Sequence, residues 1–371
     1  MKTKRHQIEN RKLKIENTPI VWQPSNAVRW MIVCIGCMGM MIAGCAQQHQ
    51  PRIGVLLPDE YNTPDGMILA PDGNIYLDCP NYNQPEYPGK LLRITKDDIV
   101  EEVFTYPAHP KTGKSAPLGI DVGPDGNFYV TDNQSFYDKN NQSRLLRVIM
   151  QKGKAVRCEV LVTGFVESNA VSCRPEGVYV TETQMDPSAW PLPSGVYRFR
   201  YNEFAGEPIE LKPGGKDAHL IVRLATGNPD WRVGANGMGF DSKGNMYVCN
   251  FGEATLMRYT FDASGAISGS EIFASGQGME SCDGIKFDPK NDDMFVADFA
   301  GNAVHRIDKN GKVTTVWKNA NDSDGIGGLL DRPSEVCLRG NKLYISNIDL
   351  PVKGNRYDPL HTISVIDVGG R

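Results

Sequence analysis

A hairpin pattern recurs six times along the chain and constrains the fold more than any other feature. Residues 234–250 show it clearly: Asn-Gly, a short apolar run, a turn rich in Asp, Lys and Gly, a second apolar run and a closing Asn. The pattern predicts two short antiparallel strands joined by a tight turn. The copies span residues 65–78, 118–132, 169–182, 236–250, 283–298 and 335–347, and successive copies begin 47 to 67 residues apart. Several short strands repeated at such a period are typical of propeller blades.

The remaining strands of each blade follow the same order. Five copies continue with a strand of the form apolar-x-Arg-apolar, as in Leu91–Ile94, and then with an outer apolar strand. The sixth copy ends after its third strand, whereas residues 53–57 form a spare apolar run that can supply its outer edge. Closing the ring in this way removes free sheet edges. We therefore predict an all-β, six-bladed propeller over residues 52–371, with four-stranded antiparallel blades and closure by an N-terminal strand. An open β-sandwich would not explain six phased copies.

The first 44 residues have the pattern of a signal peptide. Seven Lys and Arg precede or flank a short apolar run at residues 31–43, which is shorter than the roughly 20 residues of a membrane span. Ile42-Ala-Gly-Cys45 is similar to the lipobox of bacterial lipoproteins, in which the cysteine receives lipid. This predicts a signal peptide at 1–44, lipidation at Cys45, a linker at 45–51 and a location in the cell envelope outside the cytoplasm. An uncleaved short anchor is the alternative.

The charge of the remaining chain excludes some partners. Removing residues 1–44, with seven basic residues and two Glu, from a chain of formal charge −4 leaves residues 45–371 at about −9. An acidic domain does not favour nucleic acid, because phosphate contacts need a basic surface. We expect contact with a membrane through the lipid anchor only. Residues 46–371 contain no Cys-x-x-Cys pair, which argues against a zinc knuckle, and Cys249 and Cys282 are either paired or free.

Oxygen-bearing side chains open most of the hairpins. If the first strand of each blade is innermost, these start positions face the central axis; they are Asp65, Leu118, Asn169, Asn236, Asp283 and Glu335. Converging acids and amides without His or Cys predict one hard divalent cation. Calcium is our first choice, with magnesium, manganese or zinc as alternatives. The closing residues, such as Asp132 and Glu182, have the simpler interpretation of turn caps.

These motifs resemble the senescence marker protein/gluconolactonase/luciferin-regenerating enzyme-like family, which includes regucalcin. The resemblance implies a six-bladed propeller with one axial ion held by Asp65, Asn169, Asn236 and Asp283. It is closest in the fourth and fifth blades. The first-blade acid departs from the family's usual Glu-Gly-Pro, and Ala170 stands where an Asp is frequent. Glu335 is therefore an additional candidate for the cavity.

The resemblance also implies hydrolysis of a lactone or sugar-derived ester. The ion would polarise the carbonyl and activate water, and Asp283 would act as ligand and general base. The long loops carry aromatic residues that could form a rim around such a substrate, namely Tyr82, Tyr87, Phe136, Tyr137, Trp190 and Tyr357. Two alternatives stay open. One is a non-enzymatic propeller that binds a ligand or protein at the envelope; the other is chemistry like that of strictosidine synthase, with Glu335 as the spare acid.

Overall fold

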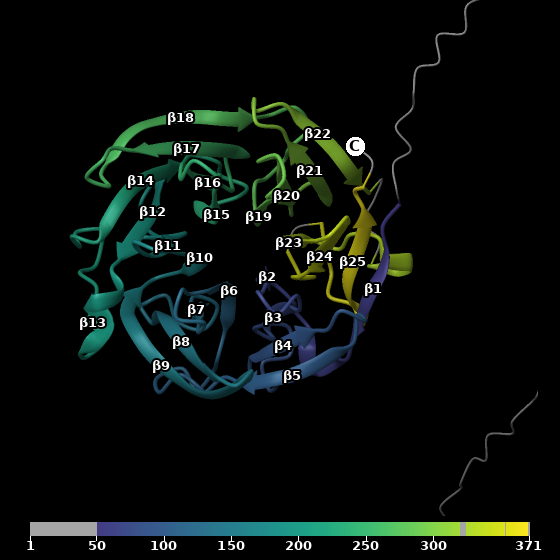
Figure 1. The fold of residues 1–371 in the computed structure, drawn as a ribbon, viewed down its shortest axis with the longest axis horizontal. Coiled ribbons are helices and arrows are strands. Elements are labelled where there is room, and N and C mark those ends of the chain that lie inside the picture. The colour runs from purple at the N-terminus through teal and green to yellow at the C-terminus, as the bar shows by residue number, and fades with distance from the viewer. Residues whose placement is uncertain (1–49, 320–323, 353, 370–371) are drawn as a thin grey trace, which may run out of the picture. The chain divides into compact units, whose positions relative to one another are not determined.

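The computed structural model describes residues 50–319, 324–352 and 354–369, and these form a closed six-bladed β-propeller (Figure 1). The predicted signal peptide, Cys45 and most of the linker lie outside the described residues, so those predictions stand as made. None of the helices in the described part of the chain has the length and apolar character that a bilayer crossing demands.

Each blade is an antiparallel sheet whose first strand lies innermost in the ring (Figure 1). The strands of blades one to three are β2 (Met67–Leu69), β3 (Ile75–Cys79), β4 (Lys90–Ile94) and β5 (Val100–Thr105); β6 (Pro117–Val122), β7 (Phe128–Asp132), β8 (Ser143–Gln151) and β9 (Lys154–Phe165); and β10 (Ser168–Arg174), β11 (Gly177–Glu182), β12 (Leu192–Phe199) and β14 (Leu220–Thr226). The two-residue strand β13 (Ile209–Glu210) was not expected, and it adds parallel to β9 at the edge of blade two.

The strands of blades four to six are β15 (Ala235–Phe240), β16 (Met246–Asn250), β17 (Thr255–Phe261) and β18 (Ile267–Ser275); β19 (Ile285–Phe287), β20 (Met294–Asp298), β21 (Ala303–Ile307) and β22 (Val313–Lys318); and β23 (Pro333–Arg339), β24 (Lys342–Asn347), β25 (His361–Asp367) and β1 (Arg52–Leu57). Strand β1 pairs antiparallel with β25, so the N-terminal strand closes the ring as predicted. Within the described ranges, three short 3-10 helices occur, at Asp59–Tyr61, Tyr201–Ala205 and Ile326–Gly328.

Local chemistry explains the turn between the first two strands of a blade. In blade one, Asp72 accepts hydrogen bonds from the backbone N–H of Asn74 at 2.9 Å and from the Tyr76 hydroxyl at 3.0 Å. Gly73 occupies the left-handed region at φ 81°, which favours glycine. The same arrangement is built around Asp125 in blade two, and in blade four Asp241, which lies six rather than four residues before its tyrosine, accepts the backbone N–H of Lys243 and the hydroxyl of Tyr247. In blades one and two the Asp-x-x-x-Tyr spacing thus ties the turn to the start of the strand after it.

The core lies between neighbouring blades. Alternate residues of each strand face one neighbour, and a cluster of buried apolar side chains fills each interface. The cluster between blades six and one includes Val55 and Leu57 of β1 together with Leu77 and Val365. Closure by β1 is thus supported by apolar packing as well as by backbone pairing.

Candidate active site

The strand registers define which residues occupy equivalent places at the start of the innermost strands. In blades one, three, four and five these places are held by Asp65, Asn169, Asn236 and Asp283, two residues before the aligned pairs Met67–Leu77, Val171–Val180, Met238–Val248 and Ile285–Val296. Leu118 holds the place in blade two. In blade six, Val336 pairs with Ile345, so the equivalent place, two residues before Val336, is held by Ser334. We call these six residues the axial ring.

Close packing of the blades explains the glycine that follows most ring residues. A Cβ at Gly66 would lie 2.0 Å from the carbonyl oxygen of Leu118, and a Cβ at Gly237 would lie 2.2 Å from that of Asp283. The N–H of Gly66 donates to Leu118 O at 3.1 Å, so the contact is also a hydrogen bond between blades. The Asp-Gly and Asn-Gly pairs of the sequence are therefore sites of backbone approach, which bring the ring side chains together.

The ring forms the floor of a cavity of about 170 Å³ at one end of the central channel. Asp65, Asn169, Asn236 and Asp283 all line this cavity, together with Leu118 and Ser334. Residues from four blades, separated by more than 200 positions in the sequence, thus meet at one place.

The two carboxyl groups of the ring lie in an electrostatically unfavourable setting. Burial raises the pKa of Asp65 to about 7, against the lowering effect of a hydrogen bond from Ser334. Burial also raises the pKa of Asp283 well above its ordinary value, and the charges of Asp65 and Glu335 add to this effect. Among the described residues, the ion pairs include neither Asp65 nor Asp283. Two buried acids that form no ion pair among the described residues, together with two amide side chains, suit a hard divalent ion.

Glu335 is not in the cavity, which corrects the expectation from the sequence. It follows the ring residue Ser334 and so occupies the position held by glycine or alanine in the other blades. Its carboxylate receives a hydrogen bond from Lys286 Nζ at 2.6 Å and one from its neighbour's backbone N–H at 2.8 Å. The inner strands of blades two, three, four and six all carry the same one-residue register shift near their start, so the pairing makes Ser334 the counterpart of Asn236, and the sequence pattern had placed the blade-six position one residue too late.

The residues that close the second strands act as structural caps. Asp132 accepts the backbone N–H of Ala116 at 2.8 Å and pairs with Arg144 at 2.6 Å. Asp298 accepts the N–H of Ser281 at 2.7 Å and contacts His305. These carboxylates fasten the segment that enters the first strand of the same blade. The simpler interpretation of this outer set is therefore confirmed.

The cavity contains residues that the sequence interpretation missed. Glu167 lines it, and burial raises the pKa of this side chain to about 7. The position directly after the second strand also contributes to the wall, with Asn133 in blade two and with Phe251, Phe299 and Ile348 in blades four to six. The sequence could have identified these wall residues, because each directly follows the residue that closes the second strand of its hairpin.

Two of the six aromatic residues expected at the rim reach the cavity. Tyr82 and Phe136 line it, and their rings stack with centroids 4.1 Å apart. The hydroxyl of Tyr82 donates to the carbonyl of Asn133 at 3.1 Å. Tyr87, Tyr137, Trp190 and Tyr357 do not belong to the cavity wall.

Two sulfur atoms face each other behind the ring. The Sγ atoms of Cys249 and Cys282 lie 2.6 Å apart between blades four and five, and both residues are fully buried. They are free cysteines in this structure, although each belongs to a hairpin end as the sequence indicated.

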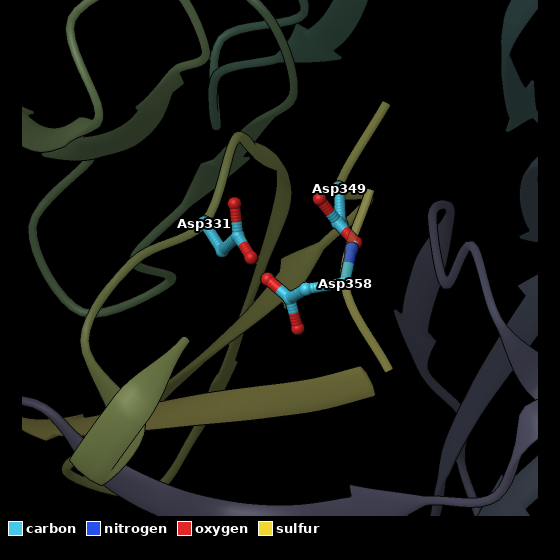
Figure 2. Close-up of side chains that lie close together, drawn as sticks. All are labelled: Asp331, Asp349 and Asp358. Atoms are coloured by element: carbon cyan, nitrogen blue, oxygen red, sulfur yellow. The ribbon is translucent and has the colours of Figure 1, made fainter. Parts of the chain in front are cut away.

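A cluster of acids holds the long loop of blade six. Figure 2 shows Asp331, Asp349 and Asp358 pointing toward one another. One carboxylate oxygen from each of the three lies within 4.8 Å of the other two. Asp349 accepts the Nδ2–H of Asn355 at 3.0 Å and the backbone N–H of Asp358 at 3.1 Å. These contacts hold in place the loop segment that contains Leu350, and Leu350 lines the cavity.

The fold and the cavity define a propeller with an oxygen-lined axial pocket, and comparison with known proteins gives the family. Residues 87–346 match the SMP-30/Gluconolactonase/LRE-like region. The chain therefore belongs to this family of lactonase-like propellers. A comparison of the sequence with curated proteins finds no match.

Solved structures of similar fold include both hydrolytic and redox enzymes. A luciferin-regenerating enzyme aligns with a TM-score of 0.58 and 13% identity, over 86% of this chain and 96% of its own. A gluconolactonase from Xanthomonas campestris aligns with 0.54 and 14%, over 86% and 94%. An aldose sugar dehydrogenase from Streptomyces coelicolor, bound to PQQ, aligns with 0.54 and 14%, over 85% and 98%. At such identities the likeness concerns the fold alone, so the activity has to be argued from the site.

Proposed function

We propose that this protein is a hydrolase of lactones that depends on a divalent metal ion, with Asp65, Asn169, Asn236 and Asp283 as the metal ligands. The observation that carries the proposal is the meeting of these four oxygen donors on the wall of one cavity. Membership of the SMP-30/gluconolactonase/LRE-like family supports it. Calcium is the first candidate for the ion, because the donor set contains oxygen alone.

The residues of the cavity are suited to ester hydrolysis. When bound, the cation would polarise the lactone carbonyl and lower the pKa of a bound water. Asp283 takes a proton from the attacking water as the water oxygen bonds to the carbonyl carbon. The ring C–O bond then breaks, and its oxygen leaves as an alkoxide that needs a proton. Glu167 lines the same cavity and retains its proton up to about pH 7, which suits it to supply this proton. The product is an open-chain hydroxy acid.

The test combines metal content with hydrolysis. Purified protein is subjected to elemental analysis, and the opening of δ-valerolactone and glucono-δ-lactone is followed in a pH-stat before and after chelation. We expect about one divalent ion per chain, loss of activity on chelation and recovery on addition of Ca²⁺. Asn236→Ala should lose both metal and activity. A chain that binds no divalent ion, and whose Asn236→Ala and Asp283→Ala variants behave like the wild type, would contradict the proposal and would favour a ligand-binding propeller.

We also propose that the propeller is held at the cell envelope by lipid on Cys45. The signal-peptide pattern of residues 1–44 and the acidic remainder of the chain support this. Fractionation of cells that express the wild type and Cys45→Ser tests it. The wild type should sediment with membranes, and the variant should not; equal distribution of the two would refute the anchor.

A further inference from the structure

The cavity wall above the axial ring has two chemically different halves. On the side of blades one to three it is formed by Tyr82, Asn133, Phe136 and Glu167; Phe136 stacks on Tyr82, and the other three carry hydroxyl, amide and carboxyl groups that can form hydrogen bonds. On the side of blades four to six the wall is apolar and comprises Trp231, Val233, Phe251, Phe299, Ile348, Leu350 and Val352. The contrast arises at equivalent positions, because Asn133, Phe251, Phe299 and Ile348 all directly follow the second strand of their blades.

The apolar half is a packed surface that exists before any ligand binds. The ring centroids of Trp231, Phe251 and Phe299 lie 5.8 Å apart in each of the three pairs. Phe251, Phe299 and Ile348 are only 4%, 5% and 4% exposed. The guanidinium of Arg332 lies 5.5 Å from the centroid of the Phe299 ring, and its Nη1 donates to the carbonyl of Phe299 at 3.1 Å. Such an arrangement offers a fixed wall to a ligand, so binding does not require the wall to be ordered first.

A polyhydroxylated lactone does not match this wall. Its hydroxyl groups would lose their hydrogen bonds to water on the side of Phe251, Phe299 and Ile348, where no side chain can replace them. An alkyl or aryl substituent would instead bury apolar surface there, which stabilises the complex. The polar half remains available for a single hydrophilic flank of the ligand, next to Asn133 and Glu167.

We propose that the substrate is a lactone with one apolar alkyl or aryl substituent, which lies against the wall formed by Trp231, Phe251, Phe299 and Ile348. The ring carbonyl then faces Asp65 and Asp283 on the floor of the cavity. This inference rests on the proposed lactonase function, and it gives that function a substrate class different from sugar lactones.

A series of δ-lactones tests the inference. The rates with δ-hexalactone, δ-octalactone and δ-decalactone are compared with the rate for glucono-δ-lactone. Because each buried methylene adds about fourfold in binding, kcat/KM should rise by about that factor per methylene until the wall is covered. We expect kcat/KM for δ-decalactone to exceed that for glucono-δ-lactone by at least about tenfold. A flat series, or a preference for glucono-δ-lactone, would overturn the inference while leaving lactone hydrolysis intact.

Matched variants locate the effect in the wall. Ile348→Ala and Trp231→Ala should lower the ratio of kcat/KM for δ-decalactone to that for δ-hexalactone by about fivefold to tenfold. Ile272, which is 60% exposed on the outer strand β18, provides the control, and Ile272→Ala should leave the ratio unchanged. A loss of stability alone would affect both lactones equally. An unchanged ratio in both wall variants would contradict the placement of the substituent.

Failure of the proposed function has a different signature. If the protein opens none of the four lactones, the same compounds serve as ligands in thermal-shift titrations. Stabilisation by δ-decalactone but not by glucono-δ-lactone, and its loss in Trp231→Ala, would retain the apolar ligand class and reject hydrolysis. No stabilisation by δ-decalactone would reject both.

Discussion

The two ends of the central channel both hold buried acids, but in different surroundings. At the cavity end, Asp65 and Asp283 have no partner of opposite charge among the ion pairs of the described residues. On the side facing away from the cavity, Lys286, three residues after Asp283 on β19, pairs at 2.6 Å with Glu335, which directly follows the ring residue Ser334. Asp121 at that end accepts the backbone N–H of Cys173 at 2.7 Å and that of Val122 at 2.8 Å.

The difference separates a structural use of acids from a ligand-binding one. Burial opposes the charge of Lys286, but Glu335 outweighs burial, and the pKa of Lys286 is raised. The chain therefore supplies its own counter-charge at one end of the channel. At the cavity end, no ion pair of the described residues includes Asp65 or Asp283, and Lys286 lowers the pKa of Asp65 only slightly against burial, so most of their charge is left for a proton or an external cation to balance. Substitution of an acid at the cavity end should therefore lower activity, whereas breaking the ion pair at the other end should lower stability.

The largest expected effect is on activity. Asp283→Asn removes the proposed base and a metal ligand with almost no change in shape, so kcat/KM for a δ-lactone should fall by about 100-fold to 10,000-fold. Asp121→Asn, the matched change at the other end of the channel, should retain activity within about threefold. The pair is measured by pH-stat on the folded proteins. Equal losses in the two variants would erase the functional distinction between the two ends.

The next effect concerns stability at the end with the ion pair. Lys286→Met leaves the carboxylate of Glu335 buried without its counter-charge, and should lower the free energy of unfolding by about 3 kcal/mol. Adding Glu335→Gln should recover most of this loss. Urea denaturation of both variants and of Glu335→Gln alone completes the double-mutant cycle. A negligible coupling energy would show that this pair is not what stabilises the acids there.

Divalent ions should stabilise the cavity end alone. At a free Ca²⁺ concentration about 100 times its Kd, the ion should add about 2.7 kcal/mol to the free energy of unfolding of the wild type. Asp283→Asn should lose this gain, and in metal-free buffer it should be at least as stable as the wild type, because it removes an uncompensated acid. Chelator titrations followed by thermal unfolding measure both quantities. Equal stabilisation of Asp283→Asn by Ca²⁺ would place the ion elsewhere.

The last effect, which is the smallest when expressed per pH unit, is a pH dependence of the metal-free protein. Burial raises the pKa of Glu182 to about 8, although its carboxylate accepts the backbone N–H groups of Val166 and Glu167. The folded state thus retains a proton that the unfolded chain releases above about pH 4.3. Stability should therefore fall as pH rises between about 4.3 and 8, by up to about 1.4 kcal/mol per pH unit from this group.

Glu182→Gln removes that titration and should flatten the slope by the equivalent of about one proton. Urea unfolding at pH 5.5, 6.5 and 7.5 in metal-free buffer provides the comparison. Identical slopes in the variant and the wild type would show that Glu182 does not carry the proton.

Local patterns in the sequence predicted most of the fold. Asp72 and Gly73 define a turn by contacts within a few residues, and alternating apolar residues define the strands that flank it. Such features repeat at a recognisable period, so blade number and the closing strand β1 could be predicted. The strand β13 was missed because two residues at an edge carry no pattern.

The candidate site was predictable where the repeats align without insertions. Asp65, Asn169, Asn236 and Asp283 were found because each opens a hairpin, and they share the cavity. In blade six the strand pairing places Ser334 in the ring, and Glu335 pairs with Lys286 of the neighbouring blade, which no local pattern reveals. Glu167 was missed because it lies in a turn before the repeat begins.

The sequence by itself determined that this chain forms six blades and that oxygen-bearing residues open their inner strands, because turn chemistry and strand alternation act over a few residues. The tertiary structure alone decided which acids are neutralised by the chain and which are left facing a cavity, and it divided the cavity wall into polar and apolar halves. Those properties depend on distances between residues of different blades, and such distances are set by the packing and register of the whole ring.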